Sequence, residues 1–185
     1  QPLPDGWKWV NFGAITRNFD GMRVPVKQSD RKPGPYPYYG ASGIIDFVSD
    51  YLFDGDYLLI AEDGANLVMR STPIAFAASG KFWVNNHAHV VQPISDVLLD
   101  FLRFYFEVAD ISKFITGSAQ PKLNQDDLNS VPIPLPPLSE QRRIAAILKE
   151  QMAAVEKARR AAQEELAAIN ALPAALLRRA FAGEL

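Results

Sequence analysis

The sequence contains no cysteine, and this absence excludes several kinds of chemistry. There can be no disulfide framework, no zinc site built on thiolates and no cysteine nucleophile. Long apolar runs are missing too. The longest, Tyr57 to Ala61 and Ile74 to Ala78, fall far short of the roughly 18 residues that a membrane span requires. We therefore expect a cytoplasmic protein with no membrane partner.

The common catalytic motifs are also missing. The chain has no G-x-G-x-x-G or P-loop, no G-x-S-x-G elbow and no H-E-x-x-H helix. Its 185 residues suffice for one ordinary domain plus an appendage. Hydrophobic residues make up 48% and charged residues 22%, which is typical of a globular chain and argues against a disordered one.

The overall charge gives no reason to expect a polyanionic ligand, because 19 basic and 21 acidic residues leave a net charge of −2. The charge is uneven, however. Between residues 17 and 32 there are five basic residues and two acidic ones, and between residues 113 and 122 there are two lysines and no acidic residue. Two local basic stretches on a mildly acidic body are a weak indication of nucleic-acid binding. Scattered, solvated surface charge explains them equally well.

A cluster of prolines at residues 132, 134, 136 and 137 separates two parts of different character. Residues 1–138 contain short runs rich in aromatic and branched residues, which predict a mixed or antiparallel sheet. Residues 95–115 have apolar residues at helical spacing and predict one helix packed on that sheet. Residues 31–43 and 116–124 are dense in glycine, proline and small polar residues and predict surface loops. The predicted strands are Trp7–Phe12, Ile44–Phe47, Tyr57–Ile60, Ile74–Ala77, Phe82–Val84 and Ala88–Val91.

Residues 139–185 predict a long helix. Ser139 is a good N-cap, Glu140 favours the positive end of the helix dipole, and the pattern stays helical for roughly 33 residues until Pro173. A short piece, Ala174 to Ala182, follows. The predicted fold class is therefore α/β (α+β), with a long C-terminal coiled-coil helix.

An apolar seam on this helix has the period of a coiled coil, because its members alternate by four and three residues. A helix about 50 Å long is too long to bury this seam against one small domain. We therefore expect a partner helix from another chain or from a part of the protein outside this sequence. The alternative is a helix folded back over its own sheet. The predicted pairing residues are Leu148, Met152, Val155, Ala162, Leu166 and Ile169, with Arg159 in the same seam.

Two groups of residues raise the question of a metal site. His87 and His89 would share one face of a strand and, with a carboxylate such as Asp63, can bind a metal. A packed or hydrogen-bonded pair of histidines is the favoured interpretation. A metal-dependent nuclease would use Asp56, Glu62 and Asp63, but no lysine stands two residues after Glu62 to complete the usual trio. We predict no catalytic residue and no metal site.

The candidates for DNA contact are gathered in the two predicted loops and around residues 70–86. Tyrosines can lie along a sugar–phosphate backbone, and Gly40 and Gly43 permit close approach. Lysines and loop amides can hold phosphates, asparagine and glutamine suit adenine edges, and arginine and lysine suit guanine. Simple solvation is the alternative for each residue. The candidates are Lys27, Arg31, Lys32, Tyr36, Tyr38, Tyr39, Ser42, Arg70, Lys81, Asn85, Asn86, Lys113, Gly117, Ser118, Gln120, Lys122 and Asn124.

One long ordered string, GSAQPKLNQDDLNSVPIPLPPLSEQRRIAAIL at residues 117–148, resembles the specificity subunits of type I restriction-modification systems. The strings LPDGWKWVNFGAI, YYGASGIIDFVSDYLFDGDYLLIAEDGANL, NNHAHVV and RRAFAGEL resemble other segments of the same family. Together they cover essentially the whole chain. The resemblance implies a DNA target recognition domain in residues 1–138 and a conserved spacer helix in residues 139–185.

The resemblance also implies a function. In that family a recognition domain reads one half of a split DNA site, and its helix pairs antiparallel with a counterpart that sets the spacing of the half-sites. Two methyltransferase subunits dock on the specificity subunit, bring S-adenosylmethionine and methylate adenine N6. Separate motor subunits restrict DNA using ATP. The chain itself is then expected to be a non-catalytic recognition subunit that carries no cofactor.

Family members usually carry two recognition domains and two helices, whereas this chain carries one of each. We expect a half-length subunit that pairs with itself in a two-plus-two complex with methyltransferase, the alternative being a piece of a longer subunit. Two other functions stay open on the residues alone. One is a scaffold that binds proteins through its coiled coil and a peptide or sugar through its sheet, and the other is the metal-dependent nuclease.

Overall fold

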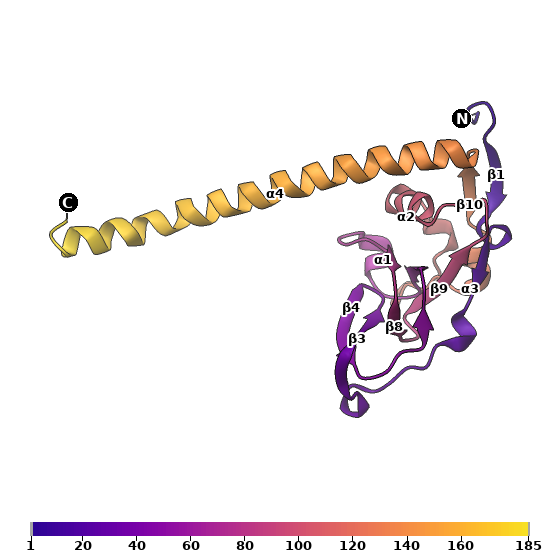
Figure 1. The fold of residues 1–185 in the computed structure, drawn as a ribbon, viewed down its shortest axis with the longest axis horizontal. Coiled ribbons are helices and arrows are strands. Elements are labelled where there is room, and N and C mark those ends of the chain that lie inside the picture. The colour runs from indigo at the N-terminus through magenta and orange to yellow at the C-terminus, as the bar shows by residue number, and fades with distance from the viewer. Residues whose placement is uncertain (1, 185) are drawn as a thin grey trace. The chain divides into compact units, whose positions relative to one another are not determined.

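Two four-stranded sheets and one two-stranded sheet form the first unit of the computed structural model, which describes residues 2–184 (Figure 1). Contacts divide the chain into two units, the first ending at Ala145 and the second beginning at Ala146. The prediction of an α+β fold with mixed and antiparallel sheets, followed by a long helix, is confirmed.

The first sheet is antiparallel throughout, with the strand order β2-β9-β6-β7. The second has the order β4-β3-β8-β5 and is mixed, because β3 and β8 run parallel. The third pairs β1 with β10. The strands are β1 (Lys8–Asn11), β2 (Thr16–Asn18), β3 (Pro33–Gly40), β4 (Gly43–Val48), β5 (Phe53–Asp54), β6 (Tyr57–Ala61), β7 (Ala75–Ala78), β8 (Lys81–Val84), β9 (Ala88–Pro93) and β10 (Pro132–Leu135), and the helices are α1 (Asn66–Met69), α2 (Leu99–Val108), α3 (Gln125–Asn129) and α4 (Leu138–Phe181).

Strand β6 organises the core because every one of its five residues is buried. Leu58 and Ile60 face one apolar cluster, which includes Phe12 and residues of α2, whereas Tyr57 and Leu59 face a second cluster around Phe82. Successive side chains of a strand point to opposite faces. A strand covered on both faces therefore has a continuous apolar run, and this explains the run that the sequence shows at residues 57–61.

All six predicted strands are present, with small shifts at their ends. The prediction of a surface loop over residues 31–43 is wrong, because most of this stretch forms β3. Its prolines fit a strand because β3 pairs with β8 only at Tyr38 and Tyr39, so no proline has to donate a hydrogen bond to β8. At Gly34 a Cβ atom would lie 2.3 Å from the Cα of Ser49, so this hairpin needs glycine there.

The proline cluster also contains a strand that the sequence did not predict. In β10, Pro132 and Pro134 alternate with Ile133 and Leu135, which are buried. Strand β10 has a single partner, β1, so the prolines can occupy positions from which no N–H is required.

The predicted helix over residues 95–115 is too long, since α2 covers only Leu99–Val108. The backbone becomes extended at Ala109, whose carbonyl accepts a hydrogen bond from Arg70. The Asp110 side chain then accepts from the amide of Ser112 and begins a separate 3-10 turn over Ser112–Phe114. These side-chain caps end the helix although the apolar spacing continues.

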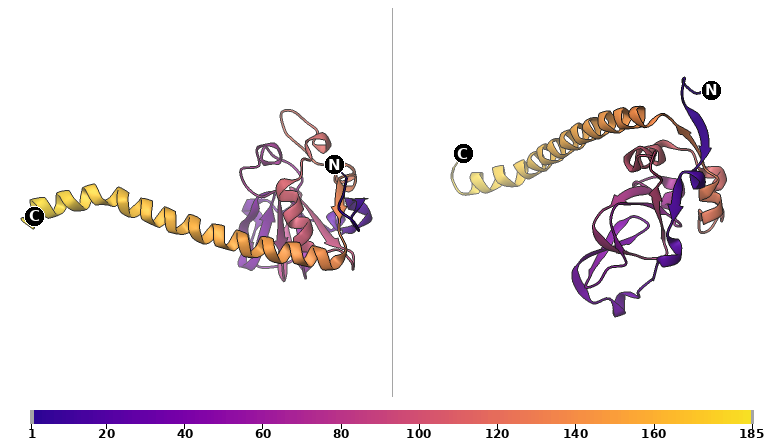
Figure 2. Two further views of the ribbon diagram at one scale, coloured as in Figure 1. Left: turned by 90° about the horizontal axis from the view of Figure 1, so that it is seen from above. Right: turned by 45° about the vertical axis from the view of Figure 1, so that its right-hand side comes forward.

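Helix α4 is 44 residues long and uninterrupted in both views of Figure 2. It begins at Leu138, so Ser139 lies within the helix and the prediction of Ser139 as the N-cap is wrong. The predicted end at Pro173 is wrong, because the helix continues through this proline to Phe181. Alanine and leucine, the strongest helix formers, flank Pro173 on both sides. Between residues 2 and 184, no helix combines the length and apolar character needed to cross a membrane.

The first turns of α4 belong to the first unit, where Gln141 fixes them. Its side chain is buried, accepts a hydrogen bond from the amide of Leu98 at 2.8 Å, and donates to the carbonyls of Asp96 and Pro136 at 3.1 and 3.0 Å. One amide thus joins the helix to the loop that precedes α2.

We expect Gln141→Ala to lower the free energy of unfolding by about 2–3 kcal/mol, because it leaves three backbone groups without a partner. Urea unfolding of the full chain measures this effect. The control is Gln151→Ala, since Gln151 lies exposed on the same helix and its loss is expected to cost less than about 0.5 kcal/mol. Equal urea midpoints for Gln141→Ala and the unmodified chain would contradict the role of Gln141.

Candidate nucleic-acid interface

Four loops of the first unit come together, and we call them the loop cluster: residues 40–43, 62–66, 85–87 and 116–122. Backbone hydrogen bonds join three of them. The amide of Glu62 donates to the carbonyl of His87 at 2.9 Å, and the amide of Gly64 donates to the carbonyl of Pro121 at 3.0 Å. Residues 40–42 face residues 63–66 across a shallow hollow of about 400 Å³. Short loops held at one site by rigid strands are typical of a binding surface.

Seven of the residues predicted to contact DNA lie in the loop cluster. Six of them are exposed, and only Asn85 is buried, with its side-chain oxygen accepting a hydrogen bond from the amide of His87 at 2.8 Å. The structure therefore brings together the following predicted residues: Ser42, Asn85, Asn86, Gly117, Ser118, Gln120 and Lys122.

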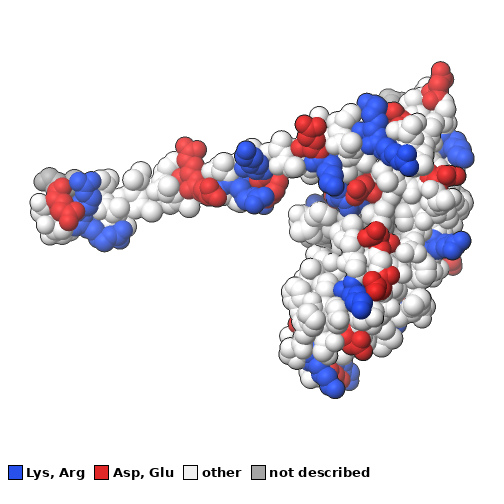
Figure 3. All heavy atoms as spheres, viewed as in Figure 1, with Lys and Arg blue, Asp and Glu red and all other residues white. Residues whose placement is uncertain are grey.

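A second group of predicted residues lies around the start of β3, whereas the loop cluster lies at the end of this strand. Lys27 and Lys32 are exposed there. Lys81 lies over the ring of Tyr51 at 4.4 Å, and Tyr36 packs against the edge of the same ring. On the face shown in Figure 3, basic and acidic side chains are interspersed. These residues thus form a group separate from the loop cluster.

Several predicted contact residues have structural partners instead. Tyr38 is fully buried, and Arg31 stacks on its ring at 4.3 Å while its guanidinium pairs with Asp46 at 3.1 Å. Tyr39 packs between Phe76 and Phe82, and burial raises the pKa of its hydroxyl. In this conformation these side chains stabilise the fold of β3 and its neighbours.

Arg70 and Asn124 act as helix caps. The Arg70 guanidinium donates to the carbonyls of Phe106 and Ala109 at 2.8 and 2.9 Å, at the end of α2, and burial lowers its pKa. Arg70 also has the only positive φ of a non-glycine residue in the described chain, 51°. Asn124 accepts a hydrogen bond from the amide of Asp127 at the start of α3.

The predicted contact residue Lys113 is exposed and lies beside the ring of Phe114.

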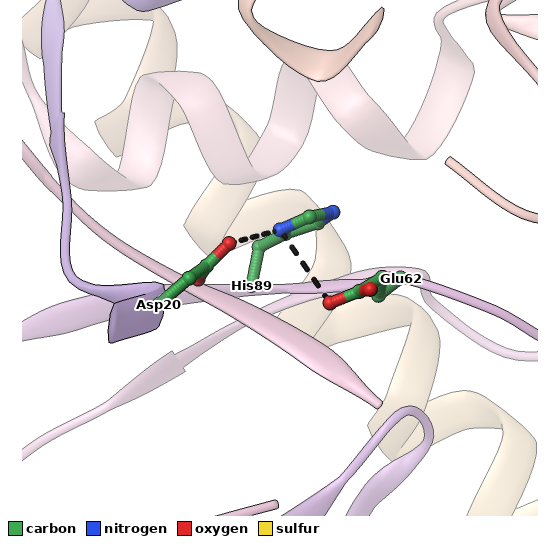
Figure 4. A group of neighbouring side chains, drawn as sticks. All are labelled: Asp20, Glu62 and His89. Carbon is green, nitrogen blue, oxygen red and sulfur yellow. Dashed lines mark hydrogen bonds and ion pairs between the residues drawn. The ribbon is translucent and has the colours of Figure 1, made fainter. Parts of the chain in front are cut away.

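An ionic network joins the loop cluster to the buried part of the sheet, and Figure 4 shows three of its members, Asp20, Glu62 and His89. His89 is 1% exposed, and its Nδ1 lies 2.5 Å from an oxygen of Asp20 while its Nε2 lies 2.8 Å from the carbonyl of Leu123. Both ring nitrogens therefore face acceptors, and a ring protonated on both nitrogens satisfies them. Through the carbonyl of Leu123, the ring fixes the end of the loop at residues 116–122.

Glu62 connects the same network to two basic side chains. Its carboxylate accepts from Arg23 Nη1 at 2.6 Å and lies 3.2 Å from Lys122 Nζ. Asp20, Glu62 and His89 have ligand atoms close enough together to hold a metal ion. The positions around the carboxylates are taken by cations of the protein itself, Arg23 and Lys122. Both carboxylates therefore have cationic partners within the protein, and we interpret the network as a structural feature that holds these segments together.

The carboxyl of Asp20 carries a pKa shift that reflects these contacts. Burial by itself raises the pKa of Asp20, but the hydrogen bond and the charge of His89, with further hydrogen bonds from the Val90 amide and Asn18, lower it below its ordinary value of 3.8. The ionised form of Asp20 is thus favoured by the fold.

The two histidines are each hydrogen-bonded, as predicted, but they do not share one face. Strand β9 begins at Ala88, so His89 lies in the strand whereas His87 lies in the turn before it. His87 Nδ1 lies 2.9 and 2.8 Å from the two oxygens of Asp63, and its side chain is 48% exposed. The idea of a metal held by both histidines is therefore wrong, because each has its own carboxylate partner.

The nuclease hypothesis is not supported by the positions of its carboxylates. Asp56 precedes β6, whereas Glu62 and Asp63 follow it. Strand β6 has five residues and rises about 3.3 Å per residue. The distance between its two ends is therefore too long for one metal ion to contact carboxylates at both. Glu62 is also paired with Arg23 and Lys122. Asp63 is hydrogen-bonded to His87.

The second unit consists of α4 from Ala146 onwards, and its apolar seam is exposed. Met152, Val155, Leu166 and Ile169 have more than half of their surface accessible, at 55%, 61%, 58% and 53%. Ala162 is exposed and Leu148 half-buried. Glu156 pairs with Arg159 at 2.9 Å along the helix surface. A helix whose apolar stripe has no cover within its own unit is typical of a coiled-coil partner.

The fold and the loop cluster define a class of protein: an α+β unit with a cluster of exposed polar loops, followed by a long helix with an exposed apolar seam. Residues 4–165 match the family model of the type I restriction modification DNA specificity domain, and the chain belongs to this family. The resemblance noted in the sequence is thus confirmed.

Individual relatives support the same conclusion. S.HindORF215P, a type I restriction enzyme specificity subunit of Haemophilus influenzae, is 39% identical over 76% of this chain and 36% of the relative. The EcoDI specificity subunit of Escherichia coli is 25% identical over 99% of this chain and 39% of the relative. This chain therefore spans less than two fifths of these curated relatives.

Solved structures have the same fold. A chain from a study of complex assembly and conformational transition of the type I R-M system superimposes with a TM-score of 0.78, at 24% identity, over 100% of this chain and 48% of that one. The HsdS subunit of Thermoanaerobacter tengcongensis gives a TM-score of 0.66 at 25% identity, over 100% and 47%.

Proposed function

We propose that this chain is the non-catalytic DNA-recognition part of a type I-like restriction-modification methyltransferase. The recognition domain, residues 1–138, reads one half of a split duplex target. The spacer helix, residues 139–185, pairs with a second helix and sets the distance between the half-sites. The observation that carries the proposal is the loop cluster, where four loops supply exposed polar side chains at one site.

The loop cluster supports base reading because its side chains suit base edges. Asn86 and Gln120 are exposed and have the amide groups that pair with adenine, and Ser42 can donate to or accept from several bases. Lys122, with 51% of its side chain accessible, can reach a phosphate from the edge of the cluster. Lys27 and Lys32, near the start of β3, can add phosphate contacts along the duplex.

The exposed seam of α4 supports the assembly. A second copy of this chain, or the second half of a longer subunit, would cover Leu148, Met152, Val155, Ala162, Leu166 and Ile169. Pairing between two copies gives a two-fold axis and therefore a palindromic, interrupted target, whereas pairing within a longer subunit gives an asymmetric one.

The enzyme activity belongs to partners. We propose that adenine-N6 methyltransferase subunits dock on this chain and bring S-adenosylmethionine, in a complex of two recognition chains and two methyltransferase chains. A motor subunit for restriction is a further partner in systems that cleave DNA. The assembly acts in the cytoplasm, where its DNA substrate lies.

Selection from a random duplex library tests the proposed function, with the full chain in complex with its methyltransferase. We expect one enriched motif, bound in a strongly salt-dependent way. A scaffold that binds a peptide or a sugar predicts no salt-sensitive binding to duplex DNA. An absence of enriched sequences would therefore overturn the proposal.

We expect Lys122→Ala to weaken binding to all duplex sequences and to reduce the slope of log affinity against log salt by about 1, because one phosphate contact is lost. Fluorescence anisotropy across a salt series measures both quantities. Asn86→Ala or Gln120→Ala is the matched comparison, since loss of a base-reading group changes sequence preference instead. If Lys122→Ala keeps the affinity and the salt slope of the unmodified chain, this lysine has no phosphate role.

A further inference from the structure

His87 is a residue of the loop cluster whose ring is both exposed and oriented by a hydrogen-bond partner. Its Nδ1 faces the two carboxylate oxygens of Asp63, at 2.9 and 2.8 Å, and 48% of its side chain is accessible. Asp63 itself is only 16% exposed, so its carboxylate is fixed within the fold. Together with residues 40–42 and Asn85, both side chains line the hollow between the loops.

The position of His87 is set from two further directions. Its amide donates to the side chain of Asn85, and its carbonyl accepts from the amide of Glu62. Glu62 is in turn held by Arg23 and Lys122 through the buried network. An exposed side chain on so firmly held a backbone is preorganised for contact with a ligand.

The Asp63 contact selects one tautomer of the His87 ring. A carboxylate can accept a hydrogen bond but has no proton to donate, so in the neutral ring the proton must lie on Nδ1. The other nitrogen, Nε2, then carries a lone pair and acts as an acceptor. Within residues 2–184 the structure gives Nε2 no hydrogen-bond partner.

We propose that His87 is a base-reading residue and that Asp63 is the positioning residue that selects its tautomer. This inference rests on the proposed function. An acceptor in the major groove recognises the exocyclic amino groups, which are N6 of adenine and N4 of cytosine, and does not bind O6 of guanine or O4 of thymine. At one position of the half-site, the strand facing His87 therefore carries an amino base, adenine or cytosine.

Nitrogen-15 NMR of the full chain tests the tautomer first. The sequence has two histidines, so one variant, His87→Ala, assigns both rings. At about pH 8, above the ordinary range of histidine titration, we expect His87 to carry its proton on Nδ1 and a free lone pair on Nε2. A proton on Nε2, alone or with one on Nδ1, would overturn the inference.

Library selection with the same complex as above tests the reading. His87→Ala is expected to lose the preference for amino bases over keto bases at one position, by on the order of 5- to 10-fold, and to keep the rest of the motif. Gln92→Ala, at the other end of β9, is the control and is expected to keep the whole motif. A motif unchanged in His87→Ala would overturn the inference.

Asp63→Asn separates positioning from a merely structural role. The side-chain amide of asparagine can donate to Nδ1 and place the ring proton on Nε2, which turns His87 into a donor. We expect the preference at that position to reverse towards guanine and thymine, and the double variant Asp63→Asn/His87→Ala to behave like His87→Ala. An unchanged tautomer and preference in Asp63→Asn would overturn the role of Asp63. If the unmodified chain selects no motif at all, the proposed function itself fails.

Discussion

In the proposed complex of two recognition chains and two methyltransferase chains, Leu166→Glu is expected to separate the two α4 helices, so that the measured mass falls to half. Leu166 is 58% exposed in the single chain and lies in the C-terminal part of the seam, between Ala162 and Ile169. Full burial of a leucine side chain contributes roughly 1.5–3 kcal/mol, and a pairing of two copies loses this twice. The dissociation constant is then expected to rise by roughly 10²- to 10⁴-fold. Light scattering measures the mass with and without methyltransferase.

Ala171→Glu is the matched control for this experiment. Ala171 lies exposed on the side of α4 opposite to Leu166, given the 3.6-residue helical repeat, and glutamate is a good helix former at either position. We expect this variant to keep the mass of the unmodified assembly. A single recognition chain in the unmodified complex, with one methyltransferase, would mean that the seam is not paired between copies of this chain.

Asp20→Asn is expected to lower the free energy of unfolding at neutral pH by about 3 kcal/mol. The substitution keeps the shape of the side chain but removes its charge, and the Asp20 side chain is only 6% exposed. It leaves the buried His89 ring and Arg23 without this carboxylate, and removal of one partner from a buried ion pair typically costs about 3–5 kcal/mol. Urea unfolding followed by tryptophan fluorescence measures the difference.

The effect of Asp20 also has a definite pH dependence. The fold lowers the pKa of Asp20 below its ordinary value of 3.8, so the unfolded chain binds the proton more tightly than the folded chain does. The contribution of Asp20 is therefore complete above that value and declines as the pH falls through the lower, folded value. We expect the gap between Asp20→Asn and the unmodified chain to stay constant near neutral pH and to close only in acid.

Asp5→Asn provides the control, because Asp5 is exposed. Its removal is expected to change the free energy of unfolding by less than about 0.5 kcal/mol at any pH. A gap for Asp20→Asn that widens as the pH falls would mean that the ionised form of Asp20 does not stabilise the fold.

Local apolar patterns predicted much of this structure because the spacing of apolar residues indicates which side chains are buried. The apolar run from Tyr57 to Ala61 indicated a strand, and every residue of β6 is buried. The four-and-three spacing from Leu148 to Ile169 indicated a helix, which α4 confirms. The ordered string at residues 117–148 indicated the family. Each of these signals is contained within a short stretch of chain.

Two predictions that the structure contradicts, the helix end at residue 115 and the loop at residues 31–43, failed for the same physical reason. Apolar spacing continued beyond Val108, but Arg70, from a distant turn, caps the end of α2. Proline and glycine predicted a loop at residues 31–43, but β3 pairs with β8 only at Tyr38 and Tyr39, so its prolines need not donate a hydrogen bond to that strand. In both cases a contact between distant segments decides the outcome, and local propensity is too weak to oppose it.

The candidate site shows the same division between sequence and structure. Composition identified the residue types that can read DNA, and the sequence by itself determined the family, six of the ten strands and the apolar seam of the long helix. Only the tertiary structure decided which candidates act together, because Asp20 and His89 are 69 residues apart and Asp63 and His87 are 24 apart. Spacing along the chain carries no information on such contacts. The fold brings these residues together since burial of the apolar strands fixes where each loop begins and ends.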